Sequence, residues 1–255
     1  MKKLSLLTLF FIASVLSVSA QAPWKAQKKK LSSISVSVSP FSETLVGLSH
    51  EDVLGLIEDP GDRLDMTGFG KADYFTTELV GASFDVKVGF AKQIRKNLLS
   101  EVQIGLSTQA ASELVLDYNY LGSQPQDFDA VSSVGLCYMH NRLGVSAGYR
   151  LRGYGRKSSF SIGPSFSGAK TFNDVVIFLG GTNANGESSV DARSSTVTRL
   201  DVNIDYSHKI AGNLAFNLGA RYGYTYFISP YNENSFGNNY GMSLGFEYQF
   251  FRNKF

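Results

Sequence analysis

The sequence predicts an all-β protein: a transmembrane antiparallel up-and-down β-barrel with a closed and filled interior. Three observations favour this fold. Apolar and polar side chains alternate with a period of two along many segments, aromatic residues gather near the ends of those segments, and the connections are alternately short and long. Because successive side chains of a strand point to opposite faces, such alternation gives one face to lipid and the other to the barrel interior.

The first 20 residues have the pattern of a secretory signal peptide. Lys2 and Lys3 precede an apolar run of 15 residues that ends at Val18, and small residues lead to a cleavage site after Ala20. The run is shorter than the roughly 18 residues that a membrane-spanning helix needs. We therefore expect residues 1–20 to be removed on export, residues 21–30 to form a periplasmic leader and residues 31–255 to form the barrel.

The predicted mature chain has no net charge. The full sequence has 24 basic and 22 acidic residues, and the two lysines lost with the signal peptide bring the basic residues to 22. We expect the basic run Lys28-Lys29-Lys30 to belong to the solvent-exposed leader. The sequence therefore does not predict a basic surface that would bind nucleic acid. Cys137 is the single cysteine, which excludes an intramolecular disulfide.

The alternation is clearest in the last two strands. In residues 214–227 every even-numbered position from Leu214 to Tyr226 is apolar or aromatic, and the final strand repeats this from Tyr240 to Phe250. An amphipathic helix would instead show a period of 3.6 residues. The full set of predicted strands, in chain order, is 34–38, 84–90, 102–106, 134–138, 143–151, 160–166, 174–179, 200–206, 214–227 and 240–250.

Two of these strands decide the strand count. Segments 160–166 and 174–179 are less regular than the others, and Pro164 lacks the backbone donor of a central strand. If both segments are strands the barrel has ten strands, and if they belong to a long outer loop it has eight. Turn-like residues at 153–157 and 167–170 lead us to favour ten.

The connections predict the orientation of the barrel. Those at 95–97, 140–142 and 209–213 are short, whereas the predicted loops 40–73, 119–130, 183–194 and 229–238 are long. Short periplasmic turns and long extracellular loops place both termini in the periplasm. In this orientation two girdles of aromatic side chains lie at the lipid headgroups, Tyr222, Tyr224 and Tyr226 on the outside and Tyr138, Tyr206, Tyr248 and Phe250 on the periplasmic side.

With this pattern the chain resembles the small outer-membrane β-barrel proteins of Gram-negative bacteria, over nearly all of residues 31–255. The resemblance implies a location in the outer membrane, contact with its lipid and lipopolysaccharide, and insertion by the barrel-assembly machinery. It also implies that Tyr248, Phe250 and Phe255 form the assembly signal. Phe255 is out of phase with the even-numbered lipid face, so either a bulge resets the register or the strand ends at Phe250.

The inward positions predict a network of ion pairs. A barrel of eight to ten strands is just wide enough for side chains to fill, so buried charges there should pair with one another. Five basic and five acidic residues fall on the predicted inner face: Lys87, Arg150, Arg152, Arg199 and Arg221 with Asp85, Glu101, Asp201, Asp205 and Glu247.

No residue set predicts catalysis, a metal or a cofactor. His140 and His208 fall at predicted periplasmic turns, and His50 stands at the start of a short helix that runs to about Glu58. The three carboxylates of residues 59–65 lack the spacing of a calcium loop.

We therefore expect a non-enzymatic barrel that acts in envelope integrity or binds a surface partner through its extracellular loops. The alternatives are a narrow channel or accessory subunit of a secretion or transport complex, a lipid- or peptide-processing enzyme that uses His50, and a secreted β-sandwich.

Overall fold

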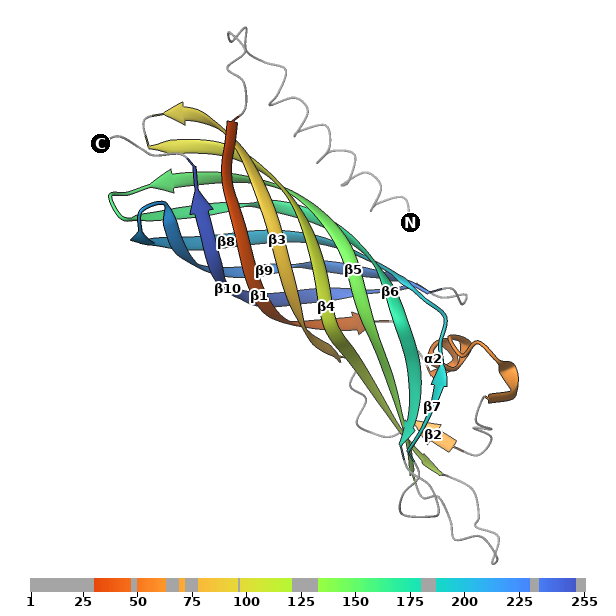
Figure 1. Cartoon of the computed structure of the whole chain (residues 1–255). Coiled ribbons are helices and arrows are strands. Elements are labelled where there is room, and N and C mark those ends of the chain that lie inside the picture. The colour runs from red at the N-terminus through yellow and green to blue at the C-terminus, as the bar shows by residue number, and fades with distance from the viewer. Residues whose placement is uncertain are drawn as a thin grey trace, which may run out of the picture.

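The chain folds into a closed antiparallel β-barrel. The computed structural model describes residues 30–46, 50–62, 69–71, 78–95, 97–120, 133–179, 187–229 and 234–250. Within these residues eight long strands pair edge to edge, and β1 pairs with β10 to close the ring (Figure 1). The eight strands are β1 (Lys30–Val46), β3 (Glu78–Arg95), β4 (Leu98–Tyr120), β5 (Ser133–Tyr154), β6 (Ser158–Leu179), β8 (Thr196–Ala211), β9 (Leu214–Ile228) and β10 (Ser235–Gln249).

Two short strands and two short helices lie outside this ring. β2 (Phe69–Lys71) pairs with β4, and β7 (Glu187–Asp191) pairs with β6. The helix α2 (His50–Gly55) and the 3-10 turn η1 (Pro60–Asp62) follow β1. Across the described residues the sheet therefore has ten strands, of which eight form the ring, and eight was the alternative count from the sequence. None of the described helices is long and apolar enough to cross a bilayer.

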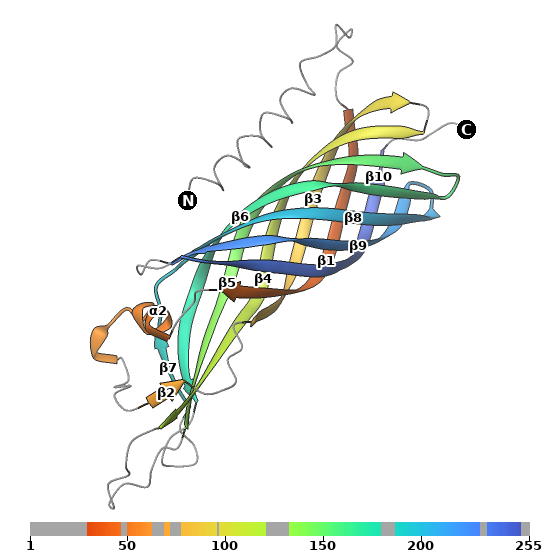
Figure 2. The ribbon, with the colours of Figure 1, turned by 180° about the vertical axis from the view of Figure 1, so that it is seen from behind.

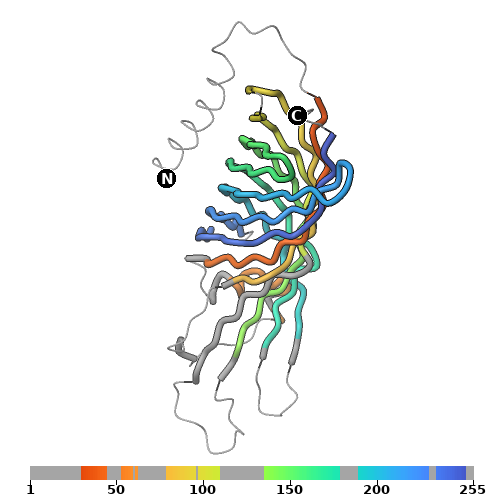
Figure 3. The backbone as a smooth tube through the Cα atoms, turned by 90° about the vertical axis from the view of Figure 1, so that its left-hand side faces the viewer, coloured from red at the N-terminus to blue at the C-terminus, as the bar shows by residue number. Residues whose placement is uncertain are grey.

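The two ends of the barrel differ. At the end that we call the turn end, β3–β4, β5–β6 and β8–β9 are joined by connections of two or three residues, and β1 begins beside the end of β10. At the opposite end, the loop end, β5 and β6 continue to pair as far as Gly135 and Leu179, although β8 ends at the pairing of Thr196 with Lys170. Figures 2 and 3 show this extension beyond the ring, with α2 and β7 beside it in Figure 2.

Two predicted turns are wrong, because the segments that they separated form continuous strands. Residues 140–142 lie inside β5, where His140 pairs with Ser112 of β4, and residues 167–170 lie inside β6. The polar side chains that indicated turns belong instead to strands whose inner face is polar. The first predicted loop is also shorter, since β1 extends through residues 40–46.

A bulge in β6 reverses the faces of that strand. Asn173 has a positive φ of 50°, and the pairings of Met139 with Val175 and of Asn141 with Phe172 leave one extra residue in β6. A bulge of this kind shifts the alternation by one position. Phe172 is exposed on the outside, whereas Val176 is fully buried on the inside. The bulge therefore directs apolar side chains into the loop end of the barrel.

Pro164 occupies the middle of the barrel wall. It pairs with Val202 of β8, while the ladder between β6 and β5 skips both Gly163 and Pro164. A Cβ atom at Gly163 would overlap the carbonyl oxygen of Tyr149, so only glycine permits this close approach of β5. The missing donor of proline is tolerated because the strand remains paired on its other side.

Candidate functional site: a closed barrel interior

The barrel interior is the candidate site, and it consists of two layers of ion pairs with a small cavity between them. The lower layer, near the turn end, joins Glu101 of β4 and Glu247 of β10 to Arg150 and Arg152 of β5. Arg150 Nε lies 2.6 Å from Glu101 Oε2 and its Nη2 lies 2.8 Å from Glu247 Oε1. Arg152 Nη2 lies 2.5 Å from the same oxygen of Glu247, and its Nε lies 3.4 Å from Glu101 Oε2.

Hydroxyl groups complete the coordination of both carboxylates in the lower layer. Ser32 and Ser33 donate to Glu101 Oε1 at 2.5 and 2.8 Å, and Ser207 donates to Glu247 Oε2 at 3.1 Å. Both glutamates are 0% exposed. Two positive and two negative charges that pair with one another can remain in a dry interior, whereas an unpaired charge there would be very costly. The lower layer is therefore a neutral, closed floor.

The upper layer, toward the loop end, is built around Glu43 of β1. Arg142 of β5 lies 2.9 Å from this carboxylate and Arg199 of β8 lies 2.5 Å from it. Thr225 also donates to Glu43, at 3.2 Å. All of these side chains are at least 95% buried. The two ion pairs thus tie together β1, β5 and β8, three strands that are not neighbours in the ring.

A phenylalanine ring compensates part of the excess positive charge in the upper layer. The guanidinium carbon of Arg199 lies 4.8 Å from the centroid of Phe41, and those of Arg221 and Arg142 lie at 5.5 and 5.7 Å. The negative face of an aromatic ring attracts such cations. His140 accepts a hydrogen bond from Arg142 Nε at 2.9 Å, and its ring lies 4.6 Å from that of Tyr138.

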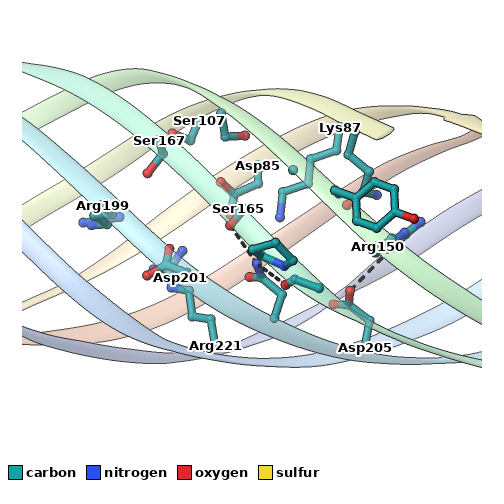
Figure 4. Close-up of a pocket in the computed structure, with 17 residues that line it drawn as sticks. Asp85, Lys87, Ser107, Arg150, Ser165, Ser167, Arg199, Asp201, Asp205 and Arg221 are labelled. Atoms are coloured by element: carbon teal, nitrogen blue, oxygen red, sulfur yellow. Dashed lines mark hydrogen bonds and ion pairs between the residues drawn. The ribbon is translucent and has the colours of Figure 1, made fainter. Parts of the chain in front are cut away.

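The cavity between the two layers is small and polar. Its volume is about 40 Å³, and the residues labelled in Figure 4 line it, with Lys87, Asp201 and Arg221 among them. Asp205 reaches across it to Arg150 Nη1 at 3.4 Å. A space of this size holds about three water molecules at roughly 10–15 Å³ each.

An apolar cap closes the loop end above the upper layer. Val53, Leu56 and Ile57, on α2 and just after it, are all 0% exposed. They pack in one cluster with side chains of the barrel wall and its extension: Leu79, Leu136, Tyr138, Val176, Phe178, Ala192, Val197 and Phe227. Two backbone hydrogen bonds fasten the cap, from Glu58 to Asp191 at 3.2 Å and from Arg193 to Leu56 at 2.7 Å.

A small polar group lies beside the apolar cap. Asp174 accepts hydrogen bonds from the hydroxyls of Tyr138 and Thr171, both at 2.5 Å, and Thr171 Oγ1 accepts one from the backbone of Ser195 at 2.5 Å. All four residues are buried. These bonds join β5 and β6 to the segment that precedes β8, below the cap.

The structure distributes the ten predicted interior charges over three groups. Glu101, Glu247, Arg150, Arg152 and Asp205 form one cluster. Arg199 pairs with Glu43 in the upper layer. The remaining four, Asp85, Lys87, Asp201 and Arg221, line the cavity.

Two central residues were missed from the sequence. Glu43 was assigned to a loop and Arg142 to a turn, although both lie in strands and meet in the upper layer. A signal was present, because the polar even-numbered positions from His140 to Arg152 stay in phase through the supposed turn.

The predicted aromatic girdle residues face outward with one exception. Tyr206, Tyr222, Tyr224, Tyr226, Tyr248 and Phe250 are all 37–63% exposed. Tyr138 is 0% exposed and belongs to the interior, because β5 is continuous and its even positions all face inward. Phe255 lies outside the described residues.

Two of the three histidines and part of the acidic turn have side chains that the structure describes, whereas the side chain of His50 lies outside them. His140, predicted at a periplasmic turn, is 1% exposed inside the barrel, and His208 is exposed near the turn end. Asp59 Oδ1 accepts a hydrogen bond from the backbone of Gly61 at 2.8 Å, as in a solvated turn. No group of three possible metal ligands occurs among the described residues.

The outer surface of the ring completes the definition of the class. Large apolar side chains such as Leu106, Leu143, Phe166, Met242 and Leu244 are each more than half exposed around the wall. Water would not tolerate a continuous apolar belt of this kind, whereas the hydrocarbon of a bilayer requires it. The chain is therefore a transmembrane β-barrel of the outer-membrane type, with an apolar outside and a charged inside.

Comparison with solved structures found several similar chains at low sequence identity. The chain resembles Neisserial surface protein A (13% identity, 86% of this chain and 97% of that chain, TM-score 0.39). It also resembles Ail of Yersinia pestis (10% identity, 86% of this chain and 99% of that chain, TM-score 0.32). A third similar structure is the outer membrane protease OmpT of Escherichia coli (10% identity, 90% of this chain and 99% of that chain, TM-score 0.37). No family model and no curated protein matches the sequence.

Proposed function

We infer that the protein is a non-conducting outer-membrane barrel, without enzymatic activity, that serves as a rigid base for a surface-exposed binding structure. The observation that carries this proposal is the closure of the interior at three levels. The lower layer, the upper layer and the apolar cap each cross the barrel, and the cavity between the layers has room for only about three waters at roughly 10–15 Å³ each.

The same construction supports a binding role at the loop end. A rigid barrel whose wall strands extend on one side is a suitable platform for loops that contact a partner. The extension of β5 and β6, with β7 and α2 beside it, presents an asymmetric surface (Figure 2). If the turn end faces the periplasm, this surface faces the cell exterior, where an envelope protein or lipopolysaccharide would be the partner.

Single-channel recording in planar bilayers tests the closed state directly. We expect the purified, folded protein to give no conductance steps under conditions in which a porin gives them. A variant with Leu56 and Ile57 changed to serine should also remain closed, because the two ion-pair layers still block the barrel. Regular conductance steps from the unmodified protein would contradict the proposal and favour the channel alternative.

A binding screen addresses the second half of the proposal. Whole cells that display the protein should capture a surface partner, and a variant in which a short Gly-Ser linker replaces residues 121–132 between β4 and β5 should lose that capture while it still folds. If this variant still captures the partner, the binding site lies outside residues 121–132.

A further inference from the structure

The exposed carboxylates of the described residues are confined to one end of the barrel. The exposed carboxylates lie at the loop end, on Glu58, Asp59, Asp62 and Asp191. In the part of the chain that the structure describes, the two glutamates near the turn end, Glu101 and Glu247, are fully buried in the lower layer. The described rim of the turn end therefore has no exposed negative charge.

Five exposed basic residues occupy that rim, which we call the basic rim: Lys30, Arg95, Arg156, Lys157 and Lys209. They belong to β1, to the end of β3, to the connection between β5 and β6, and to β8, so they are distributed around much of the ring. Lys157 and Lys209 are direct neighbours, because the backbone N–H of Lys209 donates to the carbonyl of Lys157 at 2.8 Å. None of the five forms an ion pair with a described carboxylate.

Outward aromatic residues fix the depth of the basic rim relative to the bilayer. Phe160 and Tyr206 are paired neighbours on β6 and β8, and both are about half exposed on the outside of the wall. Aromatic rings at this position mark the boundary between hydrocarbon and headgroups. Lys157 and Lys209 each lie three residues further toward the turn end, about 10 Å along a strand at roughly 3.3 Å per residue.

This spacing places the positive charges in the headgroup layer. Because barrel strands are tilted by about 35–45°, 10 Å along a strand corresponds to about 7–8 Å along the membrane normal. The polar layer on each side of the hydrocarbon core is about 5–7 Å thick. Long basic side chains can adjust their depth by a few ångströms, so their charged ends can reach the phosphate groups.

We propose that the basic rim binds the phosphate headgroups of anionic glycerophospholipids in the leaflet next to the turn end. Juxtamembrane Lys and Arg residues are attracted to anionic lipid, and the absence of exposed carboxylates on the described rim removes any competing intramolecular partner. Zwitterionic lipid carries its own ammonium group and offers no such attraction. The rim thereby selects the lipid composition around this end of the barrel.

Lipid selectivity tests this proposal. The full-length protein is reconstituted in phosphatidylcholine bilayers, and the association of spin-labelled phosphatidylglycerol is compared with that of spin-labelled phosphatidylcholine. We expect a clear preference for phosphatidylglycerol that weakens in high salt. The Lys157→Gln/Lys209→Gln variant should lose most of this preference, up to about fivefold for each basic residue removed near the anionic surface.

A matched variant at the loop end controls for total charge. Lys170→Gln/Arg193→Gln removes the same number of basic residues far from the basic rim, and it should leave the preference unchanged. Heat-modifiable gel mobility shows whether both variants fold. Equal association of the two lipids with the unmodified protein would overturn the proposal, as would an equal loss in both double variants. Neither result depends on whether the barrel conducts.

Discussion

Replacement of Glu43 by Gln tests whether the upper layer stabilises the barrel as described. The side chain is 0% exposed and holds the guanidinium groups of Arg142 and Arg199 at 2.9 and 2.5 Å. Glutamine has nearly the same shape but no charge, so both arginines would remain buried without their counter-ion. Removal of one partner from a buried ion pair costs about 3–5 kcal/mol. We expect the free energy of unfolding to fall by about that amount, a large part of the roughly 5–15 kcal/mol of a typical domain.

Urea unfolding in phospholipid vesicles measures this loss, with the folded fraction read from heat-modifiable gel mobility. Glu58→Gln is the matched control, because Glu58 is exposed and should change stability by less than about 0.5 kcal/mol. Adding Arg142→Met to Glu43→Gln should recover part of the loss, since one uncompensated charge is removed. If Glu43→Gln behaves like the control, Glu43 does not hold the upper layer together.

Three further substitutions test the wall itself, each by the same unfolding measurement. Gly163→Ala should prevent stable folding because its Cβ would overlap the carbonyl oxygen of Tyr149, whereas Gly168→Ala, with open space around it, should be neutral. Equal effects of these two substitutions on stability would contradict the close approach of β5 to Gly163. Asn173→Val should cost about 1–2 kcal/mol through its positive φ, and Asn173→Gly should be tolerated; a stable valine variant would argue against the bulge. Leu218→Arg, on the outer face between the girdles, should cost about 2–4 kcal/mol, and a neutral result would mean that lipid does not contact it.

The outer face of the barrel could be predicted from the sequence because lipid imposes a simple rule on it. Every even position from Leu214 to Tyr226 is apolar or aromatic, and the structure exposes Leu218, Tyr222 and Tyr224 on the outside. The turns predicted at 95–97 and 209–213 correspond to the connections between β3 and β4 and between β8 and β9, although Arg95 and residues 209–211 belong to the strands. These features depend only on local alternation and on residues that favour turns.

The inner face was harder to predict because a charged interior and a solvent-exposed turn use the same residue types. His140-Asn141-Arg142 has the composition of a turn, yet it continues β5, and this one error displaced Tyr138 to the lipid face. Asn173 carries no sequence signal that distinguishes a bulge from an ordinary strand residue. The pairing of Glu43 with Arg142 joins residues 99 positions apart, and no local pattern predicts such a contact.

The lower layer also bears on how the barrel closes during assembly. Arg150 and Arg152 lie on β5, whereas their partner Glu247 lies on β10, the last strand, on the opposite side of the ring. Until β10 joins β1, these arginines have only part of their counter-charge and retain water. A slip of β10 by one residue would turn Glu247 toward lipid and leave both arginines with too little negative charge. The ion pairs between β5 and β10 therefore favour one pairing of β10 with β1, because only the correct register neutralises the charges of the interior.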